Sequence, residues 1–179
     1  VIAADMMLNL PDYRSAERTF QLITQVAGRA GRADDPGRVL VQTYDPEHYA
    51  IKLAAEQDYR AFYMRESLFR RKALYPPFTV IARIVFSARE ESAAQAAAES
   101  AEAKMNAWLD TTGARIDVIQ MRALEAPIRL LRGMARWQLF LKMYFKGDLP
   151  GATRRMQALA DEAPAGVRAE LEVNPSNLF

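Results

Sequence analysis

The spacing of hydrophobic and polar residues changes along the chain, and the changes predict both helices and strands. Near the start, apolar residues recur every three or four positions from Phe20 to Ala27, as in a helix with one buried face. Ser15 precedes this run and can cap the helix. Residues 38–44 alternate between apolar and polar, which predicts a strand, and residues 1–5 resemble the end of a buried parallel strand.

Residues 45–72 return to helical spacing, which favours two helices over one. Their recurring apolar positions are Ile51, Leu53, Ala54, Phe62, Leu68 and Phe69. The sequence YPPF at 75–78 then disfavours helix at and before the prolines. We therefore expect a domain boundary there, with one domain over 1–75 and a second over 76–179.

The second domain repeats strand and helix signals in a regular order. Strands are predicted over 78–88, 115–124, 136–145 and 167–174, and helices over 89–110 and 149–164. The order β-α-β-β-α-β is the ferredoxin-like arrangement, in which two helices cover one face of a four-stranded antiparallel sheet. The other face of the sheet is then open to a partner.

The composition narrows the chemistry. The chain has 179 residues, of which 50% are hydrophobic and 26% charged, as in a globular protein. It contains no cysteine and a single histidine, His48, so a disulfide framework, a Cys/His zinc site and a cysteine nucleophile are excluded. No apolar run reaches the ~18 residues that span a bilayer, and we expect a cytoplasmic protein without a membrane partner.

The net charge of +2 conceals a basic stretch over 115–155, which contains nine basic and three acidic residues. In the strand over 136–145, alternation places one set of polar and aromatic residues on a single face: Arg136, Gln138, Phe140, Lys142 and Tyr144. Cations beside aromatic rings can hold phosphates while bases stack. Arg129, Arg132 and Gly133, in the predicted preceding loop, extend this patch. A solvated basic face is the alternative, and the residues alone leave both open.

The motif QVAGRAGR, over 25–32, is the strongest chemical signal. Arg29 and Arg32 are three residues apart, so their guanidiniums can reach a polyphosphate from one helix face. Gly28 and Gly31 remove side chains where a nucleotide could approach, and Gln25 lies one turn earlier. The alternative is an ordinary helix end, with glycines for the turn and arginines complementing the helix dipole.

This QxxGRxGR pattern resembles motif VI of superfamily 2 helicases. Together with PDYRSAER, YPPF, RWQLFLK and LEVNPSNLF, it is similar to the C-terminal portion of the PriA family of primosomal replication-restart helicases. The resemblance covers essentially the full chain. It implies the end of a RecA-like helicase lobe over 1–75 and a ferredoxin-like domain that binds DNA or a partner over 76–179.

The resemblance also implies a half of an ATP site. Arg29 and Arg32 would be catalytic, acting on the γ-phosphate as arginine fingers, with Gln25 and Gly28 beside the ATP phosphates. The full-length protein would be an ATP-dependent 3′–5′ DNA helicase that restarts stalled forks by loading the primosome. The GxxxxGK[ST] loop and the Mg²⁺-binding acidic motif are missing from this chain, so we expect no ATP hydrolysis by it alone.

The implied partners are forked and single-stranded DNA, single-stranded DNA-binding protein and other primosome proteins. The residues implied to bind them are Arg129, Arg132, Arg136, Gln138, Lys142 and Tyr144. The resemblance implies that zinc binds only in a cysteine-rich part upstream of this chain. The chain opens without an initiator Met, so we expect it to be a piece of a longer, nucleoid-associated protein. The alternatives are a stand-alone ferredoxin-like nucleic-acid-binding or adaptor module, or a different superfamily 2 motor.

Overall fold

The computed structural model describes residues 4–30, 38–112, 116–144 and 147–176. The chain divides into two compact units, Val1–Ala73 and Leu74–Phe179, and each is taken by itself below. The division lies next to the YPPF sequence. The roles predicted for the two domains stay predictions. None of the helices within these ranges is long and apolar enough to cross a membrane.

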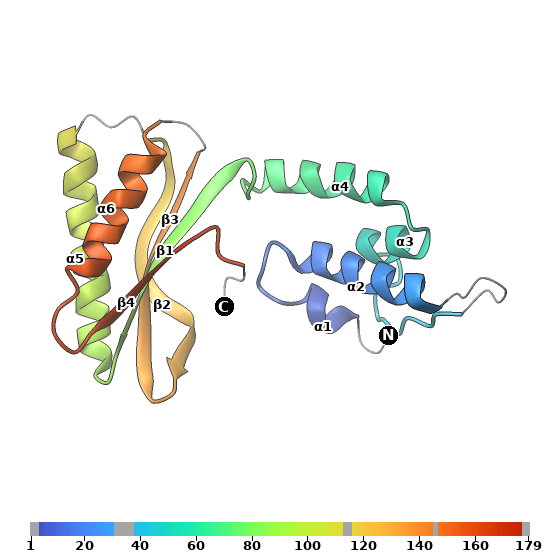
Figure 1. The fold of residues 1–179 in the computed structure, drawn as a ribbon, viewed down its shortest axis with the longest axis horizontal. Helices are drawn as coiled ribbons and strands as arrows, with labels where there is room; N and C mark the ends of the chain where they lie inside the picture. Colours follow the sequence, from blue (N-terminus) through green and yellow to red (C-terminus); the bar gives the residue numbers. More distant parts are fainter. Residues whose placement is uncertain (1–3, 31–37, 113–115, 145–146, 177–179) are drawn as a thin grey trace. The chain divides into compact units, whose positions relative to one another are not determined.

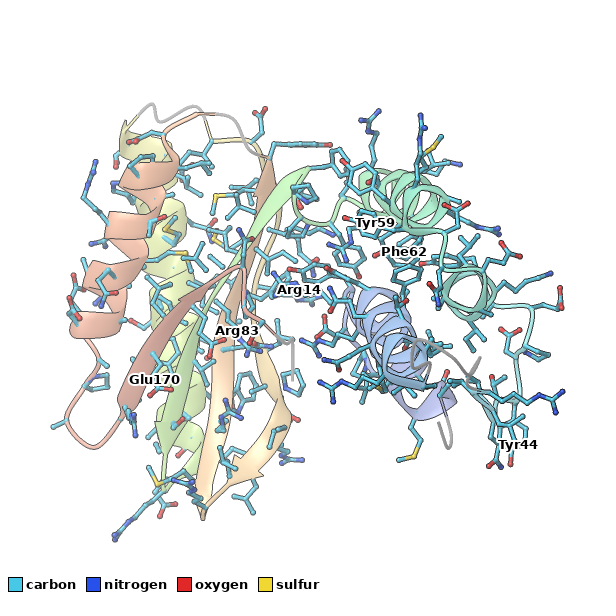
Figure 2. The ribbon with its side chains drawn as sticks, turned by 45° about the vertical axis from the view of Figure 1, so that its right-hand side comes forward. Arg14, Tyr44, Tyr59, Phe62, Arg83 and Glu170 are labelled. Atoms are coloured by element: carbon cyan, nitrogen blue, oxygen red, sulfur yellow. The ribbon has the colours of Figure 1, made fainter. Side chains whose placement is uncertain are left out.

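The first unit consists of helices (Figure 1): α1 (Asp5–Leu8), α2 (Ser15–Ala30), α3 (Tyr49–Ala55) and α4 (Tyr59–Lys72). Apolar side chains from α2, α3 and α4 form its core. The rings of Phe20 and Phe62 stack with their centroids 4.2 Å apart, and Figure 2 shows Phe62 between α4 and α2. Ile23 and Ala54 are buried beside them. Burial of these side chains holds together helices too short to persist alone.

Local hydrogen bonds set where these helices begin. The predicted pair of helices over 45–72 is confirmed, because His48 caps α3 and Asp58 caps α4 through their side chains. The prediction that Ser15 caps α2 is wrong, since its hydroxyl donates to the Leu10 carbonyl over 2.9 Å. The Asp12 carboxylate instead accepts from the backbone of Arg14 at the helix start.

The two strands predicted in this unit are not present in its described residues. Asp5 begins α1, and residues 1–3 lie outside the described ranges. Residues 38–44 are irregular, although the Ala4 N–H donates to the Gln42 carbonyl over 3.1 Å. A strand needs a neighbouring strand for its backbone groups, and none lies beside 38–44 in the part of unit one that the structure covers. Tyr44 is accordingly 95% exposed.

The second unit is an α/β domain with the predicted order of elements: β1 (Thr79–Ala88), α5 (Glu91–Thr112), β2 (Val118–Leu131), β3 (Met134–Tyr144), α6 (Leu149–Asp161) and β4 (Arg168–Val173). The four strands form one antiparallel sheet in the order β2-β3-β1-β4. Helices α5 and α6 lie on the same side of this sheet (Figure 1). The predicted four-stranded antiparallel sheet is therefore confirmed.

The core of this unit lies between the sheet and the two helices. Alternate residues of the two central strands point into it: Val80, Ala82, Ile84 and Phe86 from β1, and Leu139, Leu141 and Met143 from β3. Alanines of α5 and Met156 of α6 cover them. The small alanine side chains let α5 approach the sheet closely. The period-two alternation predicted for the strand over 136–145 is thus the alternation between the core and the opposite face of the sheet.

Candidate nucleotide and nucleic-acid sites

The last turns of α2 place Gln25, Gly28 and Arg29 on one exposed face. They share a face because residues three and four apart in a helix lie nearly above one another. Gly31 and Arg32, the rest of the motif, lie outside the described residues. A guanidinium and an amide thus project together from one helix end, where both can donate hydrogen bonds to phosphate oxygens.

Gly28 is not a helix-ending glycine, because α2 continues to Ala30 and Gly28 is not among the glycines with positive φ. A Cβ built on Gly28 would meet nothing within 4 Å. Glycine inside a helix costs about 0.5–1 kcal/mol relative to alanine. Packing in the described structure does not account for that cost, whereas a ligand approaching this face of the helix would.

A buried ionic cluster ties this helix to α4. The guanidinium of Arg70 donates to Glu66 over 2.7 Å and to Glu17 of α2 over 2.8 Å. The hydroxyl of Tyr49, at the start of α3, donates to the other oxygen of Glu66. The Arg70 guanidinium also lies 5.2 Å from the ring centre of Tyr13. One arginine therefore connects three helices and the loop before α2.

The surroundings shift the ionisation of this cluster. Burial, followed by the hydrogen bond to Glu66, raises the pKa of Tyr49 well above its usual range. For Arg70, burial lowers the pKa, but the hydrogen bonds to Glu17 and Glu66 outweigh it and the net pKa is raised. The guanidinium therefore stays charged. By its position near a helix end, Arg70 is most simply a partner of the helix dipole or a phosphate contact, and its role in this cluster was missed from the sequence.

The open face of the sheet carries the predicted residues of β3. Arg136, Gln138, Phe140, Lys142 and Tyr144 pair with β1 residues that also point away from the core. The predicted division of this strand into two faces is confirmed, but the face opposite the core is only partly open, because Ile81, Arg83 and Val85 of β1 on that face are buried. The structure therefore brings four of the six proposed contacts, Arg136, Gln138, Lys142 and Tyr144, onto one strand face.

The polar groups on this face differ in their availability. Gln138 is only 3% exposed, and its side-chain oxygen has no hydrogen-bond partner among the described residues. Lys142 is half-buried with its ammonium 4.3 Å from the ring centre of Tyr75, and burial lowers its pKa. Tyr144 is exposed. Tyr144 and the half-buried Lys142 are therefore more accessible to a ligand than Gln138.

Two further charged residues meet on this face, and the sequence analysis missed them. Arg83 of β1 is buried, and its side chain donates to Glu172 of β4 over 2.7 Å. Arg83 pairs in register with Phe140, so it lies next to the β3 row. Its partner on β4 is 89 residues away, and only the strand order brings them together.

The loop predicted before β3 is confirmed at Arg132 and Gly133 but is wrong at Arg129. Strand β2 runs to Leu131, and Arg132 and Gly133 alone form the turn, both with positive φ (+52° and +76°). Two such residues match the twist of a hairpin. Arg129 therefore lies in β2, where it pairs with Glu91 over 2.9 Å and lies 3.7 Å from Glu125. These carboxylates compensate its charge, which weakens it as a phosphate contact, whereas Arg132 is exposed at the tip.

The described ranges contain no group of three or more His, Asp or Glu side chains that could hold a metal ion. The chemistry that the described site residues support is recognition of anions. On α2 the donors are an amide and a guanidinium, and on the sheet they are guanidiniums, an ammonium and an amide. Phosphates are the anions that such donors bind best.

No family model matches the chain. Three curated relatives are each named replication restart protein PriA. The one from Treponema pallidum is 37% identical over 100% of the chain, and the one from Synechocystis is 34% identical over 99%. The one from Bacillus subtilis is 41% identical over 79% of the chain. The chain spans 26%, 20% and 17% of their lengths. It therefore belongs to the PriA family of replication restart proteins and is similar to their C-terminal portion.

Proposed function

We propose that this chain is the C-terminal part of an ATP-dependent 3′–5′ DNA helicase that restarts stalled replication forks by loading the primosome. The observation that carries the proposal is the similarity to replication restart proteins, which extends over both units of the chain. The first unit is then the end of a RecA-like helicase lobe, and the second is a ferredoxin-like domain that binds DNA or a partner.

The α2 motif acts as half of the ATP site. Arg29, with Arg32 after it, stabilises the charge that develops on the γ-phosphate, and Gln25 and Gly28 lie beside the phosphates. ATP and Mg²⁺ bind mainly to the other lobe of the complete protein, and zinc belongs to its upstream part. The shared exposed face of Gln25 and Arg29, and the open space at Gly28, support this assignment.

The ATPase assignment is tested in two proteins. The chain alone is expected to give no turnover with or without DNA, because the phosphate loop is absent. In the complete protein, Arg29→Ala and Arg32→Ala are expected to lower hydrolysis by about a thousandfold while DNA binding changes little. Arg14→Ala, at the other end of α2, is the matched control. Hydrolysis that survives both motif substitutions would exclude the arginine-finger role.

The open sheet face binds DNA, and it also receives the acidic tail of single-stranded DNA-binding protein. Arg132, Arg136 and Gln138 supply donors for phosphates or for a terminal carboxylate, and Tyr144 offers a ring for stacking. Other primosome proteins would contact the complete protein in the nucleoid.

Fluorescence anisotropy with labelled single-stranded DNA tests the sheet face. Arg132→Asn with Arg136→Gln removes two cations, and asparagine tolerates the positive φ of the turn. We expect weaker binding and a salt slope lower by roughly one to two units. Arg154→Gln with Arg89→Gln, two exposed cations away from this face, is the control. Equal affinities and slopes for the two variants would mean that the face is only solvated.

A further inference from the structure

Helix α4 has two sides of opposite character. Phe62, Glu66 and Arg70 lie one turn apart along the side that packs against the rest of the unit, where Phe62 and Glu66 are buried. The charges on this side are satisfied, because Glu66 and Arg70 pair with each other and Arg70 also pairs with Glu17. What is left to interact with other molecules is the opposite side of the helix.

That opposite side combines positive charge with apolar surface. Its exposed residues are Arg60, Met64, Leu68, Arg71 and Lys72. Glu66 is the sole acidic residue among the fourteen of α4, and it is buried. From Arg60 to Arg71 the stripe is about 16 Å long at ~1.5 Å per residue. Such a length matches several consecutive phosphates of one strand.

Two aromatic rings flank the basic stripe at the start of the helix. Tyr59 and Tyr63 are 65% and 59% exposed, and their ring centres are 6.3 Å apart. Exposed aromatic rings beside a row of cations are the surface on which single-stranded bases stack while their phosphates are held. The exposed Met64 and Leu68 add apolar contact area next to the rings.

We propose that the exposed side of α4 binds single-stranded nucleic acid, with phosphates on Arg60, Arg71 and Lys72 and a base stacked on Tyr63. The charge of the face selects the occupant, because cations without an exposed carboxylate on the same helix complement a phosphate backbone. This inference rests on the proposed DNA-binding function but places a second contact surface on the first unit, separate from the sheet face. From the sequence, the cations at 70–72 are most simply partners of the helix dipole, with a phosphate contact as the alternative.

The test uses the whole chain and a labelled oligothymidylate of about 20 nucleotides, titrated by fluorescence anisotropy between about 50 and 200 mM salt. Arg60→Gln/Arg71→Gln/Lys72→Gln is expected to weaken binding at least about tenfold at low salt and to lower the salt slope by about two units. Its control, Arg89→Gln/Lys104→Gln/Arg154→Gln, removes equal charge from the helix-covered side of unit two and should leave the slope unchanged.

Tyr63→Ala separates stacking from charge. It should weaken binding about fivefold or more without changing the slope, because stacking is not ionic. Since Tyr63 is exposed, its loss is not expected to unfold the unit. Circular dichroism on each variant checks that the fold persists.

The outcomes separate this inference from the proposed function. If the parent chain binds no DNA, the proposed DNA-binding function fails and the α4 surface fails with it. If the parent binds, the sheet-face variant binds less and the α4 variant matches its charge control, the α4 inference alone is overturned. An α4 variant that binds DNA normally but abolishes self-association in light scattering would assign the face to a protein contact, which also overturns the inference.

Discussion

Replacing Arg70 with methionine tests whether the buried ionic cluster holds the first unit together. The substitution keeps most of the side chain's length but removes both ion pairs, to Glu17 and to Glu66. The side chains of Arg70 and Glu66 are 12% and 7% exposed, so Glu66 would be left as a buried, uncompensated charge. Breaking a buried pair in this way costs about 3–5 kcal/mol.

Two features of the cluster reduce that cost. The Tyr49 hydroxyl still donates to Glu66 after the substitution, and Glu17 is 36% exposed and can be solvated. We therefore expect Arg70→Met to lower the free energy of unfolding of the first unit by about 2–3 kcal/mol. Arg71→Met, which removes an exposed neighbour, should change it by less than about 0.5 kcal/mol.

Hydrogen–deuterium exchange measured by mass spectrometry on the whole chain resolves the two units. A loss of about 2–3 kcal/mol corresponds to roughly 30- to 150-fold faster exchange in peptides from α2 and α4. Peptides from α5 are the internal control and should not change. Adding Glu66→Gln to Arg70→Met should recover part of the loss, because the uncompensated charge is then removed. Exchange in α2 no faster than in the Arg71→Met control would refute the role of the cluster.

Three further predictions concern single residues. The pKa of Tyr49 is raised in the folded state, so its contribution to stability is complete below pH 10, the unfolded value, and is lost as the pH rises further. Urea unfolding at pH 9 and pH 11 should therefore show that the free energy of unfolding falls less with pH in Tyr49→Phe than in the parent chain. Gly28→Ala should stabilise α2 by about 0.5–1 kcal/mol, measured as slower hydrogen–deuterium exchange. In the complete protein the same substitution should lower ATPase activity. Gly133→Ala should destabilise the β2–β3 hairpin by about 1 kcal/mol, because alanine disfavours the positive φ of Gly133. Unfolding monitored by the fluorescence of Trp137 measures this change.

The architecture of the second unit was predictable because the strands and helices can be recognised from the local pattern of apolar residues. In β3, every second residue from Trp137 to Met143 is apolar and packs in or against the core, so the period read from the sequence is the period of the core face. β1 is buried along nearly its whole length and was predictable as a continuous apolar run. The length of β2 was not predictable in this way. Its last residues, among them Ile128 and Leu130, are exposed, and a register shift between Glu125 and Leu130 breaks the alternation.

The strand predicted over 38–44 shows why alternation alone is insufficient. Alternating residues describe a segment that can pair, but a strand exists only when another segment supplies the matching hydrogen bonds. Among the described residues, this segment accepts a backbone hydrogen bond from Ala4, but no strand lies beside it. Leu40 and Tyr44 of this segment are exposed, whereas Val41 packs against the core of the first unit.

The charged residues show most clearly what a sequence can and cannot reveal about a site. Counting cations pointed to the stretch over 115–155, but a cation is available to a phosphate only if no carboxylate already holds it. Arg129 is held by Glu91, 38 residues away, and the partner that fixes Arg70 is 53 residues away. Such distant pairings depend on the packing of elements and leave no local trace. Helix α4 presents the opposite case. Its only acidic residue is buried and paired with Arg70, so the charged residues on the exposed side of the helix are all cations, which the sequence pattern did not reveal.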